Sequence, residues 1–246
     1  MLRSRLWDGF GRLQSLLGRH SMQGAVIEEP GVVASIVPSA PESPTLNAAV
    51  ALDPEQAVLA LPGLARRWRE AQVHRWGIWL DPSDKQVVKT LRRGGLTMTA
   101  SAPGMGTELH ELWLPSRNGD VPKADLATVG YVNDRAYGNP DARLERTLTP
   151  LPGELLTGYR TDLGGGPASV ALALRNGEDC GVSFVATVPA ARRRGLATAV
   201  MQQVLADARA AGCTSSTLQA TDAGERLYST LGFHRLCDMQ LWERRQ

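Results

Sequence analysis

Hydrophobic residues recur at helical intervals near the start of the chain. Leu6, Phe10, Leu13 and Leu17 fall on one face, which predicts an amphipathic helix over residues 1–20. The segment is rich in arginine and would also fit a mitochondrial presequence, but it lacks the continuous apolar core of a secretion signal. We therefore expect a surface helix at this end of the chain.

A second helical pattern, from about residue 194 to residue 211, carries a broader apolar stripe. The stripe consists of Leu196, Val200, Val204 and Ala208, with Ala197, Met201 and Leu205 beside them. Gly212 follows at the position where glycine commonly ends a helix. An apolar face of this width is typical of a helix that packs on a sheet.

The same order of elements is predicted twice along the chain. Residues 75–84 fit a strand and an acidic turn, residues 85–93 fit a helix, and Gly95-Leu96 leads into another strand. Residues 216–222, residues 223–230 and Gly232-Phe233 repeat this order before the last strand. A duplicated fold explains the repeat, and chance recurrence of a common βαβ unit remains the alternative.

A segment rich in proline, glycine and charge separates the two halves. The stretch "LPSRNGDVPKADL" covers residues 114–126 and is typical of an interdomain linker. We therefore predict an N-terminal domain at residues 1–114, a linker at residues 115–125 and a C-terminal domain at residues 126–246.

Composition excludes several classes of protein. The chain has 246 residues, of which 43% are hydrophobic and 21% charged, as in ordinary soluble proteins. Lys and Arg total 27 against 25 Asp and Glu, a balance too even for a dedicated nucleic-acid binder. No stretch is long enough for a transmembrane helix, so we expect no membrane partner. Three cysteines without metal-ligand spacing predict no metal site and a reducing, cytoplasmic setting.

The densest positive charge stands at the start of the long helix. Arginines 192–194 precede Gly195, at the end where the helix dipole is already positive. Such an arrangement indicates an anionic partner. Pro189 ends the preceding strand, and the small Gly195 and Ala197 allow a diphosphate to approach the free N–H groups. Exposed amides of that strand can bond an extended ligand arm, and together these features describe the binding of an acyl-coenzyme A.

These residues also resemble a known family. Arg192-x-x-Gly195-x-Ala197 resembles the R/Q-x-x-G-x-G/A signature of the GNAT superfamily of acyl-CoA-dependent N-acyltransferases, and "ERLYSTLGF" is similar to a later segment of that family. The resemblance covers the chain from about residue 126 onward, while the N-terminal half is similar only as a degenerate copy. It implies an α/β (α+β), tandem GNAT-like fold with a mixed, mainly antiparallel sheet flanked by helices in each half.

The resemblance also implies acetyl-CoA as the cofactor and indicates the residues that bind it. Pantetheine is expected to pair with the backbone near Val185 and Thr187, and the diphosphate to contact residues 193–198. Thr221 stands where the family often has an asparagine, and its hydroxyl can still donate or accept a hydrogen bond. The expected cofactor-binding residues are Val185, Ala186, Thr187, Arg192, Arg193, Arg194, Gly195, Leu196, Ala197, Thr198 and Thr221.

Acyl transfer from a thioester to an amine requires a neutral amine and a proton for the departing thiolate. The resemblance implies that Tyr228 supplies this proton, and the alternative for Tyr228 is a packing role on the sheet. The base stays open. Its candidates are Asp222, His234, a water relayed by Ser183 or by a backbone carbonyl, and Glu178 and Asp179, which we expect in a solvated turn.

The predicted function is transfer of an acetyl group from acetyl-CoA to a primary amine by direct attack in a ternary complex. The acceptor is a small molecule or a protein amine, and a homodimer is compatible with the sequence. Acceptor specificity is expected from residues that include Tyr131, Asn133, Asp134 and Tyr137, although Asn-Asp is also common in helix capping. The alternative function is a non-catalytic acyl-CoA-binding or regulatory module that has lost its proton-transfer residues.

Overall fold

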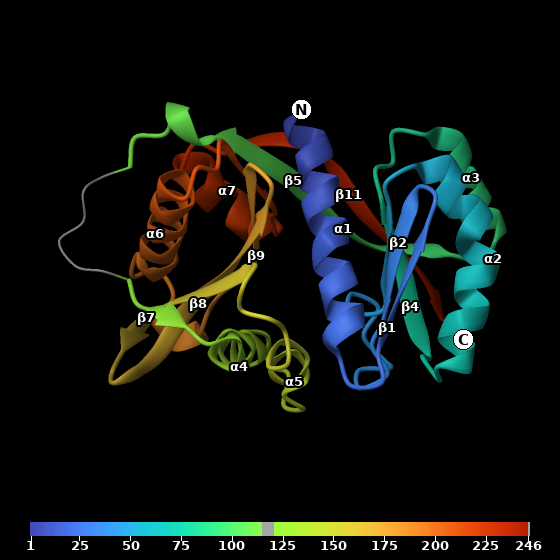
Figure 1. The fold of residues 1–246 in the computed structure, drawn as a ribbon, viewed down its shortest axis with the longest axis horizontal. Coiled ribbons are helices and arrows are strands. Elements are labelled where there is room, and N and C mark those ends of the chain that lie inside the picture. Colours follow the sequence, from blue (N-terminus) through green and yellow to red (C-terminus); the bar gives the residue numbers. More distant parts are fainter. Residues whose placement is uncertain (115–120, 246) are drawn as a thin grey trace. The chain divides into compact units, whose positions relative to one another are not determined.

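A computed structural model divides the chain into two compact units (Figure 1), and each has buried hydrophobic clusters of its own. Unit 1 contains residues 3–104 and the final strand from Leu236 onward, and unit 2 contains residues 105–235. The structure describes residues 1–114 and 121–245. Within these residues, no helix combines the length and the apolar character needed to cross a lipid bilayer.

Unit 1 is a sheet with helices on both faces. Its elements are α1 (Leu2–His20), β1 (Ala25–Glu29), β2 (Val32–Ile36), β3 (Ala48–Ala51), α2 (Pro54–Glu70), β4 (Arg75–Leu80), α3 (Lys85–Arg93), most of β5 (Thr97–Glu108) and most of β11 (His234–Arg245). The strand order is β1-β2-β3-β4-β11-β5. The β3–β4 pair is parallel, whereas the β1–β2, β2–β3 and β4–β11 pairs are antiparallel.

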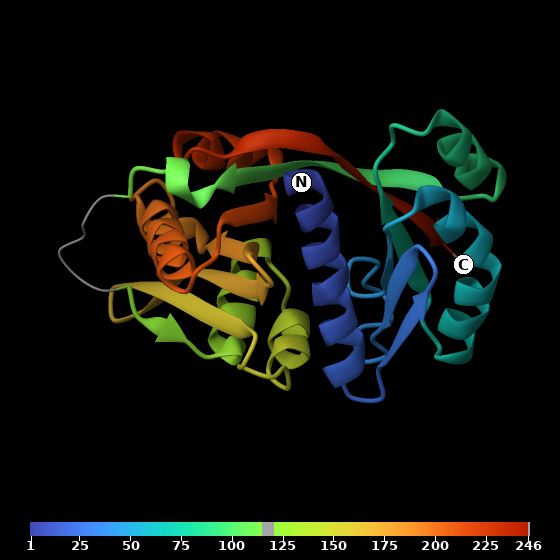
Figure 2. The same cartoon turned by 45° about the horizontal axis from the view of Figure 1, so that its top comes forward.

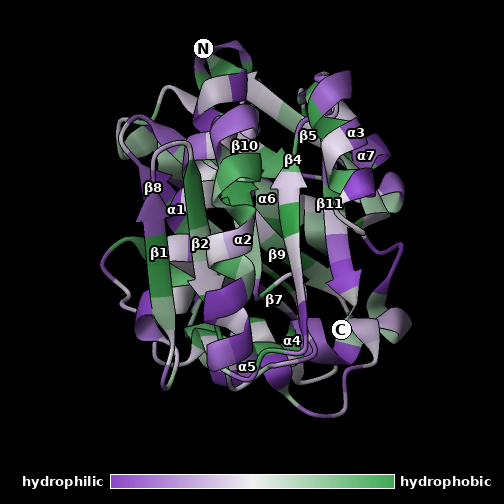
Figure 3. Cartoon of the chain, turned by 90° about the vertical axis from the view of Figure 1, so that its right-hand side faces the viewer, coloured by the Kyte–Doolittle hydropathy of each residue, from purple (hydrophilic) through white to green (hydrophobic). Residues whose placement is uncertain are grey.

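Alternate residues of β3 and β4 face two different layers. Val50 and Trp79 pack in a cluster with residues of α1, whereas Ala49 and Ile78 pack with residues of α2 and α3. Because successive side chains of a strand point to opposite faces, α1 covers one face of the sheet and the other two helices cover the second (Figure 2). Figure 3 shows the hydrophobic colouring of β2, where Val32 is fully buried.

Unit 2 repeats this plan. Its remaining elements are two short 3-10 helices (Leu109–Glu111 and Pro189–Ala191), β6 (Lys123–Ala124), α4 (Leu126–Tyr137), α5 (Arg143–Leu148), β7 (Leu156–Leu163), β8 (Gly166–Asn176), β9 (Asp179–Thr187), α6 (Leu196–Ala210), β10 (Ser215–Gln219) and α7 (Asp222–Thr230). The strands lie in the order β10-β9-β8-β7-β6, and only the β9–β10 pair is parallel. Helices α4 and α6 both pack on β7, β8 and β9.

The repeat predicted from the sequence is present in the fold. In each unit a helix connects two parallel strands and a shorter helix follows, as β3-α2-β4-α3 in unit 1 and as β9-α6-β10-α7 in unit 2. The other strand pairs described above are antiparallel, so the expected mixed, mainly antiparallel sheet flanked by helices is confirmed.

The units differ from the predicted domain boundaries because two strands pass from one unit into the other. Residues 105–114 belong to unit 2, and β11 from Leu236 onward belongs to unit 1. There β11 pairs with β4, and its Glu243 carboxylate, 4% exposed, accepts hydrogen bonds from Arg75 (2.8 Å) and Thr99 (2.5 Å). Backbone pairing with β4 and these two side-chain hydrogen bonds connect the last strand to unit 1.

The predicted linker is only partly covered by the described structure. Residues 115–120 lie outside the described residues, whereas Lys123 and Ala124 form β6 and pair with β7. The end of the expected linker is therefore part of unit 2. An assignment of separate N-terminal and C-terminal domains at this segment stays a prediction.

Candidate functional site

The site in unit 2 is built around β9, which parts from its neighbour β10. The two strands pair in parallel from Asp179 to Val182, and β10 ends soon afterwards at Gln219. β9 continues to Thr187, and its pairing with β8 slips in register around Phe184, which has a φ of 53°. This β-bulge bends the strand. The last residues of β9 extend past the end of β10, so one of their edges is not covered by that strand.

Alternate amides of β9 point toward that open edge. The N–H of Val188 donates to the carbonyl oxygen of Ala168 at 2.9 Å, on the side of β8. Because successive N–H groups of a regular strand point to opposite edges, that of Thr187 faces away from β8. An extended ligand that contains amides fits this edge as an added strand does.

Helix α6 begins without a side-chain cap. Gly195 is its N-cap residue and has a φ of 75°, a conformation that favours glycine. A Cβ atom at this residue would meet no atom within 4 Å, so the space beside the backbone is open. The N–H groups of the first turn have no partner within the helix and are available to an anion.

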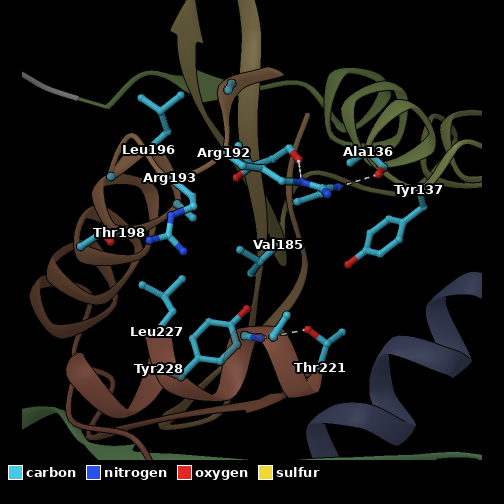
Figure 4. A pocket seen from close by; sticks show the side chains of 17 residues that line it. Ala136, Tyr137, Val185, Arg192, Arg193, Leu196, Thr198, Thr221, Leu227 and Tyr228 are labelled. Atoms are coloured by element: carbon cyan, nitrogen blue, oxygen red, sulfur yellow. Dashed lines mark hydrogen bonds between the residues drawn. The ribbon is translucent and has the colours of Figure 1, made fainter. Parts of the chain in front are cut away.

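A cavity of about 590 Å³ joins the open strand edge to this helix start (Figure 4). Its lining includes every expected cofactor-binding residue except Arg194, together with Tyr228 from α7 and Tyr137 from the end of α4. The fold thus brings together residues from four separate stretches of the sequence. That they bind a cofactor stays a prediction.

The three arginines before Gly195 occupy different environments. Arg192 donates from Nε to the carbonyl oxygen of Thr187 at 3.1 Å and from Nη2 to that of Ala136 at 2.9 Å. Arg193 is exposed, has a φ of 62° and lines the cavity, whereas Arg194 is exposed outside it. The sequence places the three arginines side by side, and only the folded chain shows which guanidinium already has partners.

Tyr228 lies on α7, and its ring reaches the cavity wall (Figure 4). The side chain is buried, with 6% of the residue exposed, and it packs against Phe233 with ring centroids 6.0 Å apart. Burial raises the pKa of Tyr228 above the ordinary tyrosine value, and the nearby Tyr137 raises it further. The hydroxyl is therefore protonated at neutral pH and can donate a proton or a hydrogen bond.

Thr221 acts as the N-cap of the helix that carries Tyr228. Its Oγ1 accepts a hydrogen bond from the N–H of Gly224 at 3.1 Å, so the hydroxyl proton remains for donation elsewhere. Thr221 is exposed and lines the cavity, where the resemblance expected it.

The candidate bases are placed less favourably. Asp179 is fully buried as the first residue of β9 and accepts hydrogen bonds from Ser215 and Thr217, each at 2.6 Å. The expectation of a solvated turn is therefore wrong for Asp179. Asp222 and His234 are exposed. Among the described residues that line the cavity, none is a carboxylate or a histidine.

The expected acceptor-side residues also divide by role. Asp134 is 3% exposed, and its carboxylate accepts hydrogen bonds from the N–H groups of Leu144 and Glu145 at the start of α5. The structure thus gives Asp134 the capping role that was the alternative for this Asn-Asp pair. Asn133 donates to the carbonyl oxygen of Phe184 in the bulge, at 3.4 Å. No local sequence pattern relates Asp134 to α5.

Comparisons with known proteins agree with this geometry. Residues 140–233 match the acetyltransferase (GNAT) family, whose members generally bind acetyl-CoA. No curated protein matches the chain by sequence.

Solved structures with a similar fold cover both units. A GCN5-related N-acetyltransferase from Kribbella flavida has a TM-score of 0.68 and 18% identity, covering 99% of this chain and 95% of that chain. A tandem GNAT protein from the clavulanic acid biosynthesis pathway has a TM-score of 0.57 and 10% identity, covering 98% and 94%. At these identities the likeness shows the fold alone. Residues 140–233 are thus a GNAT acetyltransferase domain, carried in a chain whose fold is that of GNAT proteins, a tandem GNAT protein among them.

Proposed function

We propose that the chain is an acetyl-CoA-dependent N-acetyltransferase that transfers the acetyl group directly to a primary amine in a ternary complex. One observation carries the proposal. A single cavity in unit 2 joins the uncapped start of α6, the open edge of β9 and the protonated hydroxyl of Tyr228. These three features match the diphosphate, the pantetheine arm and the thioester of one molecule.

The donor binds from the helix start toward the bulge. The diphosphate accepts hydrogen bonds from the first N–H groups of α6 and is attracted by the exposed side chains of Arg193 and Arg194. The pantetheine amides pair with the backbone near Val185 and Thr187, along the edge of β9 that extends beyond β10. The thioester then lies toward Tyr228, on the far side of the cavity from the arginines.

The reaction needs alignment and two proton transfers. The amine nitrogen attacks the thioester carbonyl, a C–N bond forms, and the C–S bond breaks. Tyr228 gives its proton to the departing thiolate and recovers one from water. The proton released by the amine leaves through water, since no carboxylate or histidine is among the described residues that line the cavity. The acceptor, whether a small molecule or a protein amine, must therefore reach the site in its neutral form.

The same observation favours a second candidate, a non-catalytic acyl-CoA-binding or regulatory module. A cavity that keeps its anion site but has no base among its described lining residues suits binding without turnover. A cytoplasmic location is part of both proposals. It is supported by the three cysteines, which are free thiols in the structure.

The test separates binding from catalysis. Acetyl-CoA binding is measured by calorimetry, and release of free CoA thiol is then followed with a panel of amines that spans a wide range of amine pKa. We expect binding together with turnover of at least one amine, favouring amines that are neutral at the assay pH. Binding without turnover of any amine would favour the non-catalytic module, and absence of binding would overturn both candidates.

A further inference from the structure

Arg192 joins two elements of unit 2 that are distant in sequence. Its Nη2 donates to the carbonyl oxygen of Ala136 in the last turn of α4, and its Nε donates to the carbonyl oxygen of Thr187 at the end of β9. The two bonds, 2.9 and 3.1 Å long, have ordinary hydrogen-bond lengths. One guanidinium therefore fixes the end of a helix relative to the end of a strand.

Arg192 is exposed, but its guanidinium already donates to two carbonyl oxygens in this position. The last carbonyl groups of a helix have no partner within the helix and carry the negative end of its dipole, which favours a cation there. The guanidinium thus caps α4 in the way that basic side chains commonly cap helix ends. A second, longer link lies nearby, where Asn133 of α4 donates to the carbonyl oxygen of Phe184 in the bulge at 3.4 Å.

Both groups held by Arg192 belong to walls of the cavity. The carbonyl of Thr187 lies on the same strand edge as the N–H group to which we assign pantetheine. The carbonyl of Ala136 is in the peptide group that leads to Tyr137, which lines the cavity opposite Tyr228 (Figure 4). A shift of either peptide group changes the distance between the end of α4 and β9, the strand along which we place the acetyl donor.

We propose that Arg192 is a positioning residue and not a ligand of the diphosphate. It holds β9 and α4 at the separation that lets donor and acceptor meet, and it leaves the anion to Arg193 and the N–H groups of α6. The inference rests on the proposed function, because it takes the cavity as the acetyl-CoA site. It departs from the signature, which implies that Arg192 contacts the cofactor.

The first test measures how salt affects coenzyme A binding. A cation that contacts phosphate loses its attraction as salt rises, so removing it flattens the dependence of the dissociation constant on ionic strength. We expect Arg193→Ala to weaken coenzyme A binding about tenfold at low salt and to flatten that dependence. In Arg192→Gln the dissociation constant of coenzyme A should depend on ionic strength as steeply as in the wild-type protein, whatever the absolute affinity of the variant. Equal flattening in both variants would overturn the proposal for Arg192.

The second test uses the best amine of the panel and steady-state kinetics. Arg192→Gln should raise KM for the amine or lower kcat by about tenfold, and Arg192→Lys, which restores the cation beside α4, should recover part of this loss. Arg193→Ala should raise KM for acetyl-CoA alone. An effect of Arg192→Gln confined to KM for acetyl-CoA would contradict the positioning role. If the wild-type protein does not bind coenzyme A at all, the proposed function fails first, and the calorimetry shows this separately.

Discussion

The two units begin their long helices with the same first backbone hydrogen bond but with different N-cap residues, which are extended in unit 1 and left-handed in unit 2. In unit 1, Asp53 is the N-cap of α2, and its carboxylate accepts hydrogen bonds from the N–H groups of Glu55 (3.0 Å) and Gln56 (3.2 Å). In unit 2, Gly195 holds the equivalent place before α6 and offers no side chain. In both helices the residue four positions later donates to the carbonyl of the N-cap residue at 2.9 Å.

This difference concerns the N–H groups at the two helix starts, which are occupied in unit 1 and lack a side-chain cap in unit 2. A carboxylate at the N-cap occupies the same N–H groups that a phosphate would use. Glu55 adds a second negative charge to the first turn of α2, which further disfavours an anion. Unit 2 leaves these groups open and places exposed arginines before them instead.

The following helices make a similar contrast. Leu91 and Tyr228 occupy equivalent turns of α3 and α7, and in each the residue five positions later donates to their carbonyl at 3.0 Å. Gly95 and Gly232 follow with φ values of 80° and 92°, as the close of such a helix requires. Unit 1 thus keeps the turn with a buried leucine and has no hydroxyl at that position.

The largest effect is expected from removing the hydroxyl of Tyr228, since unit 1 has Leu91 at the equivalent position. Tyr228→Phe keeps the ring and removes the proton donor, so the chemical step should fall by about 10²- to 10⁴-fold while acetyl-CoA affinity hardly changes. Single-turnover rates at saturating acetyl-CoA measure this. Tyr159→Phe is the matched control, because Tyr159 donates to Asp207 at 2.9 Å and does not line the cavity. A Tyr228→Phe rate equal to the control would refute the role of general acid.

The next effect tests the open helix start. Acetyl-CoA at about 100 times its dissociation constant should stabilise the wild-type protein by about 2.7 kcal/mol. Gly195→Trp should abolish this stabilisation because the indole fills the space beside the first turn. Gly195→Ala distinguishes backbone strain from blocking of the cofactor. It strains a left-handed residue by about 1–2 kcal/mol but leaves most of the space beside the first turn open. Thermal unfolding with and without acetyl-CoA measures both, and an undiminished gain in Gly195→Trp would place the cofactor elsewhere.

A smaller effect is expected from the cap in unit 1. Asp53→Ala should lower the free energy of unfolding of unit 1 by about 0.5–2 kcal/mol, because two N–H groups lose their acceptor. Urea unfolding monitored by tryptophan fluorescence measures it, and Asp53→Asn, which keeps an acceptor, should lose less. The stoichiometry of acetyl-CoA should remain one per chain, since α2 has no arginine–glycine entry. Binding of a second molecule would show that the carboxylate alone closed this site.

The smallest effect concerns pH, because we expect the single-turnover rate not to fall as the pH rises. The pKa of Tyr228 is raised above the ordinary value of about 10, so the acid stays protonated as pH rises from about 7 to about 9. The single-turnover rate should therefore not fall over this range, and any rise should follow the deprotonation of the acceptor amine. A descending limb with an apparent pKa below about 9, absent in Tyr228→Phe, would contradict this assignment.

The sequence alone determined the local features of this protein. The periodicity of α1 and α6, the repeated strand–helix–glycine order and the segment Arg192-x-x-Gly195-x-Ala197 all depend on neighbours within a few residues. Positive φ at Gly195 and at Gly232 follows from the same local rules. Because these local segments resemble those of the GNAT superfamily, the expected cofactor residues could be named before the fold was known, and all but Arg194 line one cavity.

Only the tertiary structure decided which partners the polar groups have and to which unit the last strand belongs. Asp134 caps a helix that starts nine residues later, Asp179 is buried under Ser215 and Thr217, and Arg192 reaches the carbonyl of Ala136. These side chains could equally have met water in an isolated segment. Their roles depend on which distant carbonyl, hydroxyl or amide the fold brings within hydrogen-bonding distance, and no local pattern encodes that distance.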